Sequence, residues 1–325
     1  MAFRDLLSLV SQAPSKPAMG VLARIEPWVQ AARPLAFPMI FIPLLMGQAF
    51  AFDAHGQFSG MSLLYTALFG VLFQVYLLYT NDHADEAIDK TNKQHWLSGG
   101  SRVLPEGKLR SADLLVGSRI AFALMLGLTF YLVVDHNRPW LPVGMALAVV
   151  LCWAYNRHPL RLSYRGHGEV LQGLGCGVLL PLIGFFMQTG SLQQFPWSAL
   201  VSLFLVFYAG NIITALPDYR SDRAGGKHTY PVRYGELTAR ASALLLLAVA
   251  YISSVFAFPT TSPSRLAIVV IPACLVLIAI AGSGVLRNAD VAEFSVCKSF
   301  VNWTSASQAW FLCAWIGVLF VGSSL

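Results

Sequence analysis

The chain has 325 residues, of which 56% are hydrophobic and only 12% are charged, and its mean hydropathy is +0.61. A soluble domain carries roughly a quarter charged residues, so this composition excludes an ordinary soluble protein and indicates a chain that faces lipid. The net charge of +6 does not indicate a nucleic-acid partner, because the basic residues fall between apolar runs and form no patch on a soluble fold. We expect an integral membrane protein with no nucleic acid among its partners.

The N-terminal segment, residues 1–33, precedes the first long apolar run. Residues 6–10 are too short an apolar stretch for a signal peptide, and Pro14 and Pro17 follow them. Residues 21–33 mix apolar and charged positions, which is typical of a helix that lies in the membrane interface, with Trp28 at headgroup level. We expect one domain over residues 1–325 that begins with this interfacial segment.

Nine apolar runs have about the length that a membrane-spanning helix needs, roughly 20 residues. The sequence therefore predicts an all-α bundle of about nine transmembrane helices, of which the fourth is the weakest because it is short. The runs cover residues 34–53, 62–81, 112–134, 140–156, 169–189, 197–217, 239–258, 264–286 and 303–323.

The lysines and arginines are distributed unevenly between the two faces of such a bundle. With nine spans, all of the 22 except Arg138 and Arg265 share the side of the N-terminus. The positive-inside rule then predicts a multi-pass protein of the cell (inner) membrane with a cytoplasmic N-terminus. The two long loops, 82–111 and 218–238, lie on this side, so we expect a cytoplasmic-side active site.

Acidic residues are concentrated where these two loops begin. If the second helix continues past residue 81, Asp82, Asp85 and Asp89 lie at positions i, i+3 and i+7 and share one face. Glu86 falls near the same face and cannot be excluded by spacing. Asp218 and Asp222 form an i, i+4 pair at the end of the sixth run.

Clustered carboxylates repel one another, and a divalent cation relieves that repulsion. Mg²⁺ prefers oxygen ligands and is usually held by one or two carboxylates together with substrate phosphates. Two facing clusters would each hold an ion with a diphosphate between them, whereas the alternative is a set of solvated loop charges. Glycines and basic residues beside both clusters favour the metal and phosphate interpretation, and Arg102, Arg223 and Lys227 are the candidate phosphate contacts.

Other kinds of site find less support in the sequence. No two of the five cysteines form a C-x-x-C pair, and the histidines show no H-E-x-x-H or H-x-x-E-H spacing, so we expect inert thiols and no histidine-bound metal. The rival class is a cation-coupled membrane transporter, which would use intramembrane carboxylates. The acidic clusters lie at span ends instead of mid-bilayer, which favours an enzyme.

The pattern Asn81-Asp82-x-x-Asp85-x-x-x-Asp89, followed by Asp218-x-x-x-Asp222, resembles the UbiA superfamily of intramembrane prenyltransferases over nearly the whole chain. Within it the chain is most similar to the 1,4-dihydroxy-2-naphthoate branch of menaquinone synthesis. That similarity is carried by Arg33-Pro34, by Gly99-Gly100-Ser101-Arg102-Val103-Leu104, and by residues 155–162 with Gly166-x-Gly168-Glu169. Residues 214–217 depart from that branch, and the spacing of Asp85 and Asp89 is closer to the 4-hydroxybenzoate branch. The acceptor therefore stays open between the two rings.

The resemblance implies Mg²⁺-dependent transfer of a prenyl group from a polyprenyl diphosphate to an aromatic acceptor. It implies that the metal ligands are Asp82, Asp85, Asp89, Asp218 and Asp222, and that Arg102, Arg223 and Lys227 contact the diphosphate. Asn81 is expected to orient the site. Tyr155 and Arg161 match a loop that faces the acceptor, although an aromatic-belt residue and a topological charge explain them equally well. Glu169 would position the acceptor or cap a helix.

Overall fold

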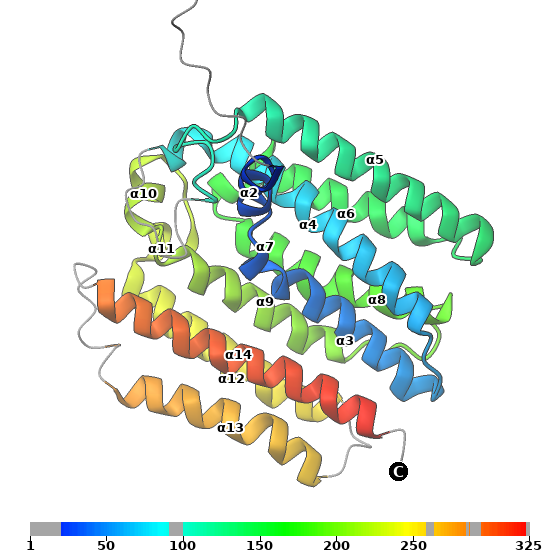
Figure 1. Cartoon of the computed structure of the whole chain (residues 1–325). Helices are drawn as coiled ribbons and strands as arrows, with labels where there is room; N and C mark the ends of the chain where they lie inside the picture. The colour runs from blue at the N-terminus through cyan, green and yellow to red at the C-terminus, as the bar shows by residue number, and fades with distance from the viewer. Residues whose placement is uncertain (1–20, 91–99, 258–262, 284–285, 287–293, 323–325) are drawn as a thin grey trace, which may run out of the picture.

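The computed structural model describes residues 21–90, 100–257, 263–283, 286 and 294–322, and within these ranges every regular element is helical. Gly99 and residues 1–20 of the predicted interfacial segment lie outside the described ranges. The long helices run roughly side by side in one bundle (Figure 1). They are α3 (Pro38–His55), α4 (Gly60–Asp89), α5 (Ser111–Asp135), α6 (Leu141–Asn156), α9 (Ala199–Ala215), α12 (Glu236–Ala257), α13 (Pro263–Gly282) and α14 (Phe294–Gly322), together with α8 (Leu180–Thr189), which ends a longer helical segment.

Shorter elements connect or extend these helices. They are α2 (Val21–Ala32), η1 (Pro34–Ala36), η2 (Leu162–Arg165), α7 (Gly168–Gln172), the π-helix η3 (Gly173–Leu179), α10 (Tyr219–Ala224) and α11 (Tyr230–Tyr234). α7, η3 and α8 follow one another without a break and correspond to the fifth predicted run. α10 and α11 lie in the second long loop.

Six helices in the described ranges are long and apolar enough to cross a membrane, or seven if α2 and α3 count as one bent span. α6 and α9 are apolar but have only 16 and 17 residues. The all-helical, multi-pass membrane architecture is therefore confirmed. The count of nine spans stays a prediction, although each of the nine runs coincides with helix.

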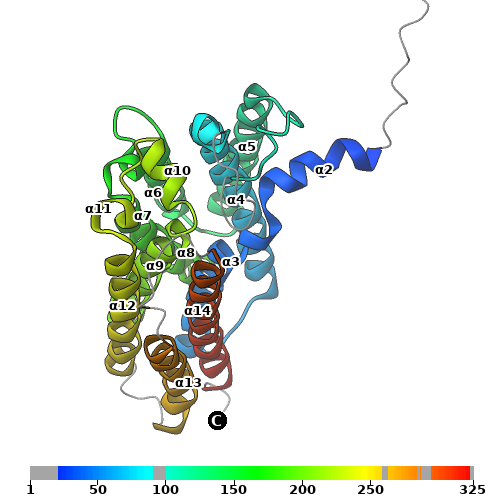
Figure 2. The ribbon, with the colours of Figure 1, turned by 90° about the vertical axis from the view of Figure 1, so that its left-hand side faces the viewer.

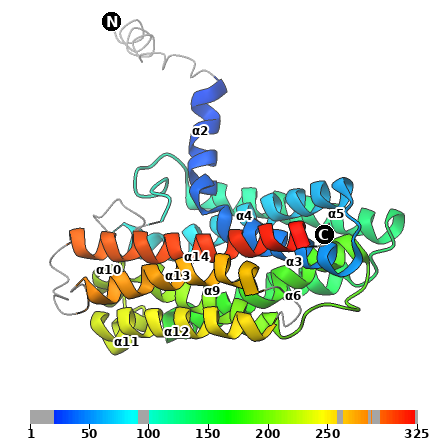
Figure 3. The same ribbon diagram turned by 90° about the horizontal axis from the view of Figure 1, so that it is seen from below.

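The first helix leaves the bundle at a bend. The axes of the segments Arg24–Ala36 and Pro38–His55 differ by 54°, and Figure 3 shows α2 projecting away from the other helices. The last turns of α2 are held against α4, since the Tyr79 hydroxyl donates to the Trp28 carbonyl oxygen (2.9 Å) and the two rings pack together. The chain therefore turns sharply just before the first long helix.

Glycines let two central helices touch. α3 packs closely against α8, and a Cβ atom on Gly47 would collide with the Pro181 carbonyl, while one on Gly184 would collide with that of Leu44. In a membrane the hydrophobic effect does not favour helix association, because lipid is as apolar as the side chains. Helices therefore associate by close packing, which small residues such as glycine allow. This contact fixes α3 and α8 in the middle of the bundle, also seen from the side in Figure 2.

Candidate active site at the acidic end of the bundle

α4 continues as an unbroken helix through Asp89, as the acidic spacing predicts. Asp82, Asp85 and Asp89 are 2%, 8% and 8% exposed, so all three carboxylates are buried on one face. Glu86 stands apart from them and forms an ion pair with Lys90 at 2.8 Å. The first acidic cluster is therefore the three aspartates without Glu86.

The loop after α4 folds back on this cluster. Asp82 accepts hydrogen bonds from the Arg33 guanidinium and from the Ser101 hydroxyl. Gly100 has a left-handed backbone (φ +70°), and a Cβ there would run into the carboxylate of Asp89. Arg102 donates to the carbonyl oxygen of Asp89 (2.9 Å) and so covers the end of α4. Gly100 is needed because only glycine fits both the conformation and the close approach.

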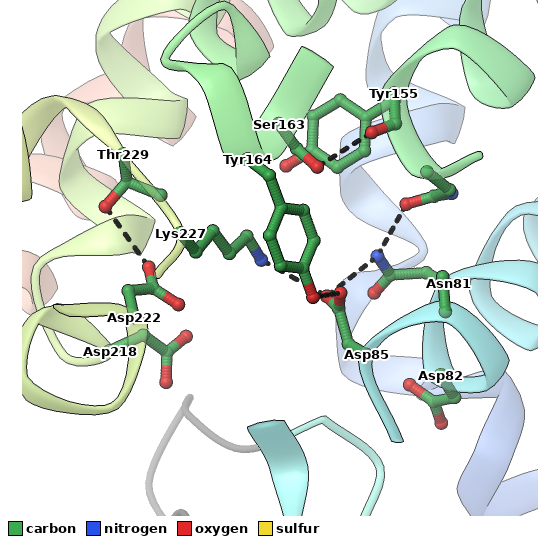
Figure 4. A network of polar contacts seen from close by, with 12 residues as sticks. Asn81, Asp82, Asp85, Tyr155, Ser163, Tyr164, Asp218, Asp222, Lys227 and Thr229 are labelled. Atoms are coloured by element: carbon green, nitrogen blue, oxygen red, sulfur yellow. Dashed lines mark hydrogen bonds and ion pairs between the residues drawn. The ribbon is translucent and has the colours of Figure 1, made fainter. Parts of the chain in front are cut away.

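The second cluster lies at the start of α10 and not at the end of α9. α9 stops at Ala215, Pro217 follows, and Asp218 is the residue before α10. The i, i+4 relation survives, because the Asp222 amide donates to the Asp218 carbonyl oxygen (2.8 Å). Asp222 is 4% exposed and accepts a hydrogen bond from Thr229 (3.2 Å). The break after Ala215 turns both aspartates toward α4 (Figure 4).

Lys227 lies between the two clusters (Figure 4). Its ammonium is 3.1 Å from the Asp85 carboxylate and also attracts Asp222. Asp89 is repelled both by its neighbours on α4 and by Asp218 across the gap. The nearest members of the two clusters, Asp89 and Asp218, are 129 residues apart in sequence. The two clusters nevertheless act on one another electrostatically.

Tyr164 and Arg161 pack beside Asp85. The Tyr164 hydroxyl donates to Asp85 (2.6 Å), and the Arg161 guanidinium lies 3.4 Å from the centre of the Tyr164 ring. Arg161 also donates to the carbonyl oxygen of Ala84 (3.3 Å). A cation over an aromatic face is attracted by the ring quadrupole, so this stack orients the tyrosine. Arg161 therefore contacts α4, orients Tyr164, and also attracts the Asp85 carboxylate electrostatically.

Asn81 connects the acidic cluster to the interior of the bundle. Its amide donates to Asp85 (3.3 Å) and to the side chain of Asn156 on α6 (2.9 Å), which supports the predicted orienting role. Both asparagines and Tyr155 line a cavity of about 150 Å³ that extends from here between α4, α6 and η3. The Tyr155 backbone is fixed by a hydrogen bond from Ser163 (2.7 Å). Tyr155 therefore lines this cavity from α6.

Two hydrogen bonds tie the segment around η2 to the loop that carries Lys227. The His228 amide donates to the Tyr164 carbonyl oxygen (3.0 Å), and the Tyr230 amide donates to the Glu169 carboxylate (2.8 Å). Glu169 is 2% exposed. Because its carboxylate is taken up by the backbone of α11, Glu169 serves this connection and does not face the cavity.

The charges in the second loop are set by burial and by their neighbours. Burial raises the pKa of the Asp222 carboxyl to about 7, and the nearby Lys227 ammonium offsets only part of that effect. Burial would lower the pKa of Lys227, but the Asp85 and Asp222 carboxylates outweigh it and raise that pKa well above its usual value. Lys227 is therefore a permanent cation, while Asp222 carries its negative charge at the cost of desolvation.

The donor set fits Mg²⁺. Five carboxylates converge at the acidic end, and they are hard oxygen ligands of the kind this ion prefers. Among the described residues no three acidic, histidine or cysteine side chains are close enough to form a protein-only metal cage. Mg²⁺ seldom needs one, since it is commonly held by one or two carboxylates and by substrate phosphates. The raised pKa of Asp222 marks a carboxylate that a cation would stabilise.

One predicted residue stands apart, and four others were missed. Arg223 is exposed and donates to the Tyr219 hydroxyl (3.3 Å), so the structure does not bring it to either cluster. Four residues contact the aspartates directly but were not predicted as site residues: Arg33, Ser101, Tyr164 and Thr229. Arg33 and Ser101 lie within stretches that carry the family resemblance, which was the available signal. No signal of this kind pointed to Tyr164 or Thr229.

Comparison with known proteins identifies the family. The model of the UbiA prenyltransferase family matches residues 40–305. The 1,4-dihydroxy-2-naphthoate octaprenyltransferase of Bacillus subtilis is 26% identical over 244 residues, which cover 74% of each chain. Its namesake from Escherichia coli is 24% identical, over 67% of this chain and 72% of the relative.

Solved structures share the fold. A UbiA homolog from Archaeoglobus fulgidus, bound to GPP and Mg²⁺, superposes with a TM-score of 0.64 at 16% identity, covering 89% of this chain and 99% of the homolog. The helical bundle, the paired aspartates and the family match over most of the chain lead to one conclusion. This chain belongs to the UbiA prenyltransferase family.

Proposed function

We propose that this prenyltransferase moves a polyprenyl group from a polyprenyl diphosphate to 1,4-dihydroxy-2-naphthoate, in an Mg²⁺-dependent reaction at the cytoplasmic face of the cell (inner) membrane. The observation that carries the proposal is that two aspartate clusters, one on α4 and one at the start of α10, face each other with Lys227 between them, and that all of these aspartates except Asp218 are buried. The acceptor is supported by the names of relatives in three bacteria, all 1,4-dihydroxy-2-naphthoate octaprenyltransferases. An Mg²⁺-bound structure of a homolog supports the metal.

The chemistry needs a site that stabilises a leaving diphosphate. The allylic C–O bond breaks and its electron pair goes to the diphosphate, so negative charge grows there in the transition state. Mg²⁺, when bound by the aspartates, would supply most of the positive charge that this step requires. Lys227 and Arg33 place two further cations beside the same carboxylates, where they favour the transition state more than the substrate. The aromatic ring then forms the new C–C bond and loses a proton.

The residues around the clusters have separate tasks in this scheme. Tyr164 and Asn81 hold the two oxygens of Asp85 and so fix the ligand in position. Ser101 does the same for Asp82. Tyr155 lines the cavity on the side of the clusters and is available to contact a substrate ring.

A membrane assay tests the proposal. Membranes that contain the full chain are incubated with labelled polyprenyl diphosphates and with 1,4-dihydroxy-2-naphthoate or 4-hydroxybenzoate, with Mg²⁺ or with a chelator. We expect prenylated naphthoate only when Mg²⁺ is present, loss of product in Asp222→Asn, and retention in the control Glu86→Gln. Product only with 4-hydroxybenzoate would reject the acceptor but keep the reaction, and catalysis in chelator would reject the metal. Cation flux without any prenyl product would favour a transporter.

A further inference from the structure

The loop that follows α4 folds on a small hydrophobic core that is separate from the core of the bundle. Residues of α2, α4, α5 and the loop itself build it: Ala31, Ala32, Tyr79, Val103, Leu104 and Leu114. Ala31, Val103 and Leu114 are fully buried, at 0% exposed. Burial of apolar side chains is the main favourable force that orders such a loop. Because α2 supplies two of these residues, the position of the loop depends on α2.

Polar contacts join α2 to the first acidic cluster by two routes. The Gln30 side chain donates to the Ser101 carbonyl oxygen (2.8 Å) and accepts from the Lys108 ammonium (2.8 Å). The Ser101 hydroxyl in turn donates to Asp82. Arg33, the residue after α2, also donates to Asp82. One route therefore passes through the loop, and the other is direct.

Arg33 joins α2 to η1, just before the bend that leads into α3. Its backbone is left-handed (φ +46°, ψ +72°), which is disfavoured for a residue with a Cβ atom. The helix axes on the two sides of the bend differ by 54°. A change in the direction in which α2 leaves the bundle would therefore move the Arg33 guanidinium relative to Asp82.

Another face of α2 points outward. Ile25 and Val29, at positions i and i+4, are 48% and 49% exposed, and Leu35 in η1 is 93% exposed. Figures 2 and 3 both show α2 leaving the bundle sideways. It is attached at Tyr79, two residues before the polar end of α4 begins at Asn81. The outward face of α2 therefore lies where the apolar and polar parts of the bundle meet.

The bilayer is the partner that fits this face. A Cβ on Gly117 would lie 2.8 Å from the Trp28 ring, so α2 adjoins α5, one of the helices able to cross a membrane. Val116 and Ile120, which share a face of α5, are 52% and 56% exposed. Arg24, exposed on α2, suits lipid phosphates. An apolar stripe beside a lipid-facing helix, with a cation at its edge, is typical of a helix in the headgroup boundary.

We propose that the face formed by Ile25 and Val29 is seated in the headgroup boundary of the bilayer, and that this lipid contact holds Arg33 and Ser101 on Asp82. The inference rests on the proposed function in taking Asp82 as a metal ligand. It adds that lipid is part of what positions that ligand. When α2 leaves the membrane surface, the loop loses one side of its small core, and Asp82 loses both of its partners.

Two paired substitutions test this seating in the full chain, in nanodiscs of phosphatidylcholine and phosphatidylglycerol. Ile25→Glu with Val29→Glu opposes contact with lipid, whereas Ile25→Trp with Val29→Trp keeps side chains that favour the interface. In the Glu pair we expect prenyl transfer to fall at least about tenfold, the half-saturating Mg²⁺ concentration to rise, and amide hydrogen exchange to quicken in residues 100–110. The Trp pair should be at least about tenfold more active than the Glu pair. Glu26→Gln, exposed on the same helix, is the control.

The two readouts separate this inference from the function on which it rests. If the unaltered chain transfers no prenyl group, the proposed function fails, and hydrogen exchange alone decides whether lipid holds the loop. Unchanged exchange and activity in the Glu pair would show that the face is solvated and overturn the proposal. So would faster exchange with unchanged activity, or equal losses in both pairs, which would indicate a protein partner. If the Glu pair fails to fold, Ile25→Glu alone replaces it.

Discussion

The ammonium of Lys227 lies 3.1 Å from the carboxylate of Asp85, although the two residues are 142 positions apart in the chain. Lys227 follows the second acidic cluster and Asp85 belongs to the first, so this ion pair joins the halves of the site. Both side chains are mostly buried, at 13% and 11% exposed. A buried ion pair is costly to break, because the remaining charge is left without a partner.

The substitution Lys227→Met removes this cation and leaves the buried Asp85 carboxylate without its ion pair. We expect prenyl transfer to fall by at least about 100-fold and the free energy of unfolding to fall by up to roughly 3–5 kcal/mol. Initial rates and chemical unfolding in detergent measure the two effects. Lys90→Met is the control, since Lys90 pairs with Glu86 at the surface. Equal rates in both variants would show that Lys227 has no part in the reaction.

Tyr164→Phe deletes one hydroxyl and keeps the ring beneath Arg161. The lost hydrogen bond to Asp85 has a charged acceptor and is worth about 1.5–3 kcal/mol. We expect kcat to fall about tenfold or more while protein yield and fold are retained, as measured by steady-state kinetics and circular dichroism. Tyr131→Phe, which removes a hydroxyl at the opposite end of the bundle, should have the activity of the unaltered chain.

Gly100→Ala combines two penalties at the loop after α4. The left-handed backbone disfavours alanine by about 1 kcal/mol, and the new methyl group would displace Asp89. We expect a loss of activity well beyond the loss of stability. Gly107→Ala is a matched control, because Gly107 has a similar φ of +66° with nothing within 4 Å. If the two variants had the same activity, the approach of Gly100 to Asp89 would be unimportant.

The pKa of Asp222 predicts a pH dependence. The folded value is about 7 and the ordinary value is 3.8, so between these the folded state binds more protons than the unfolded chain. Without metal, the free energy of unfolding should therefore decrease as the pH rises from about 4 to 7. Binding of Mg²⁺ needs the deprotonated carboxylate, so the apparent affinity for Mg²⁺ should increase over the upper part of the same range.

Melting temperatures with and without Mg²⁺, measured from pH 5 to 8, test both trends. The stabilisation by Mg²⁺ should grow with pH in the unaltered chain and in Glu86→Gln. It should be smaller and nearly constant in Asp222→Asn. A constant Mg²⁺ effect in the unaltered chain would contradict the assignment of Asp222 as the titrating ligand.

Local patterns predicted much of this molecule. Apolar runs gave the positions of the long helices, since lipid burial depends only on the composition of a segment. The spacing of Asp82, Asp85 and Asp89 predicted their shared face because α4 stays regular through Asp89. Asp218 and Asp222 were correctly paired, but their spacing alone does not reveal the break after Ala215, which separates them from α9.

Contacts between distant segments could not be read in the same way. Arg33 and Tyr164 reach the aspartates from other segments, 49 and 79 residues away, and no periodicity connects such positions. Arg223 is the opposite case. It is next to Asp222 in sequence, yet the turn of α10 points it into solvent. Adjacency along the chain is a poor guide to the geometry of a charged loop.

The hydrogen bonds from His228 to Tyr164 and from Tyr230 to Glu169 have a mechanical consequence. They fasten the loop that carries Lys227 to the segment that leads into α7. That same segment touches α4 through Tyr164, so it works as a spacer of fixed length between the two groups of carboxylates. Tilting of single helices in bilayers of different thickness would then move both sides of the gap together and leave its width unchanged.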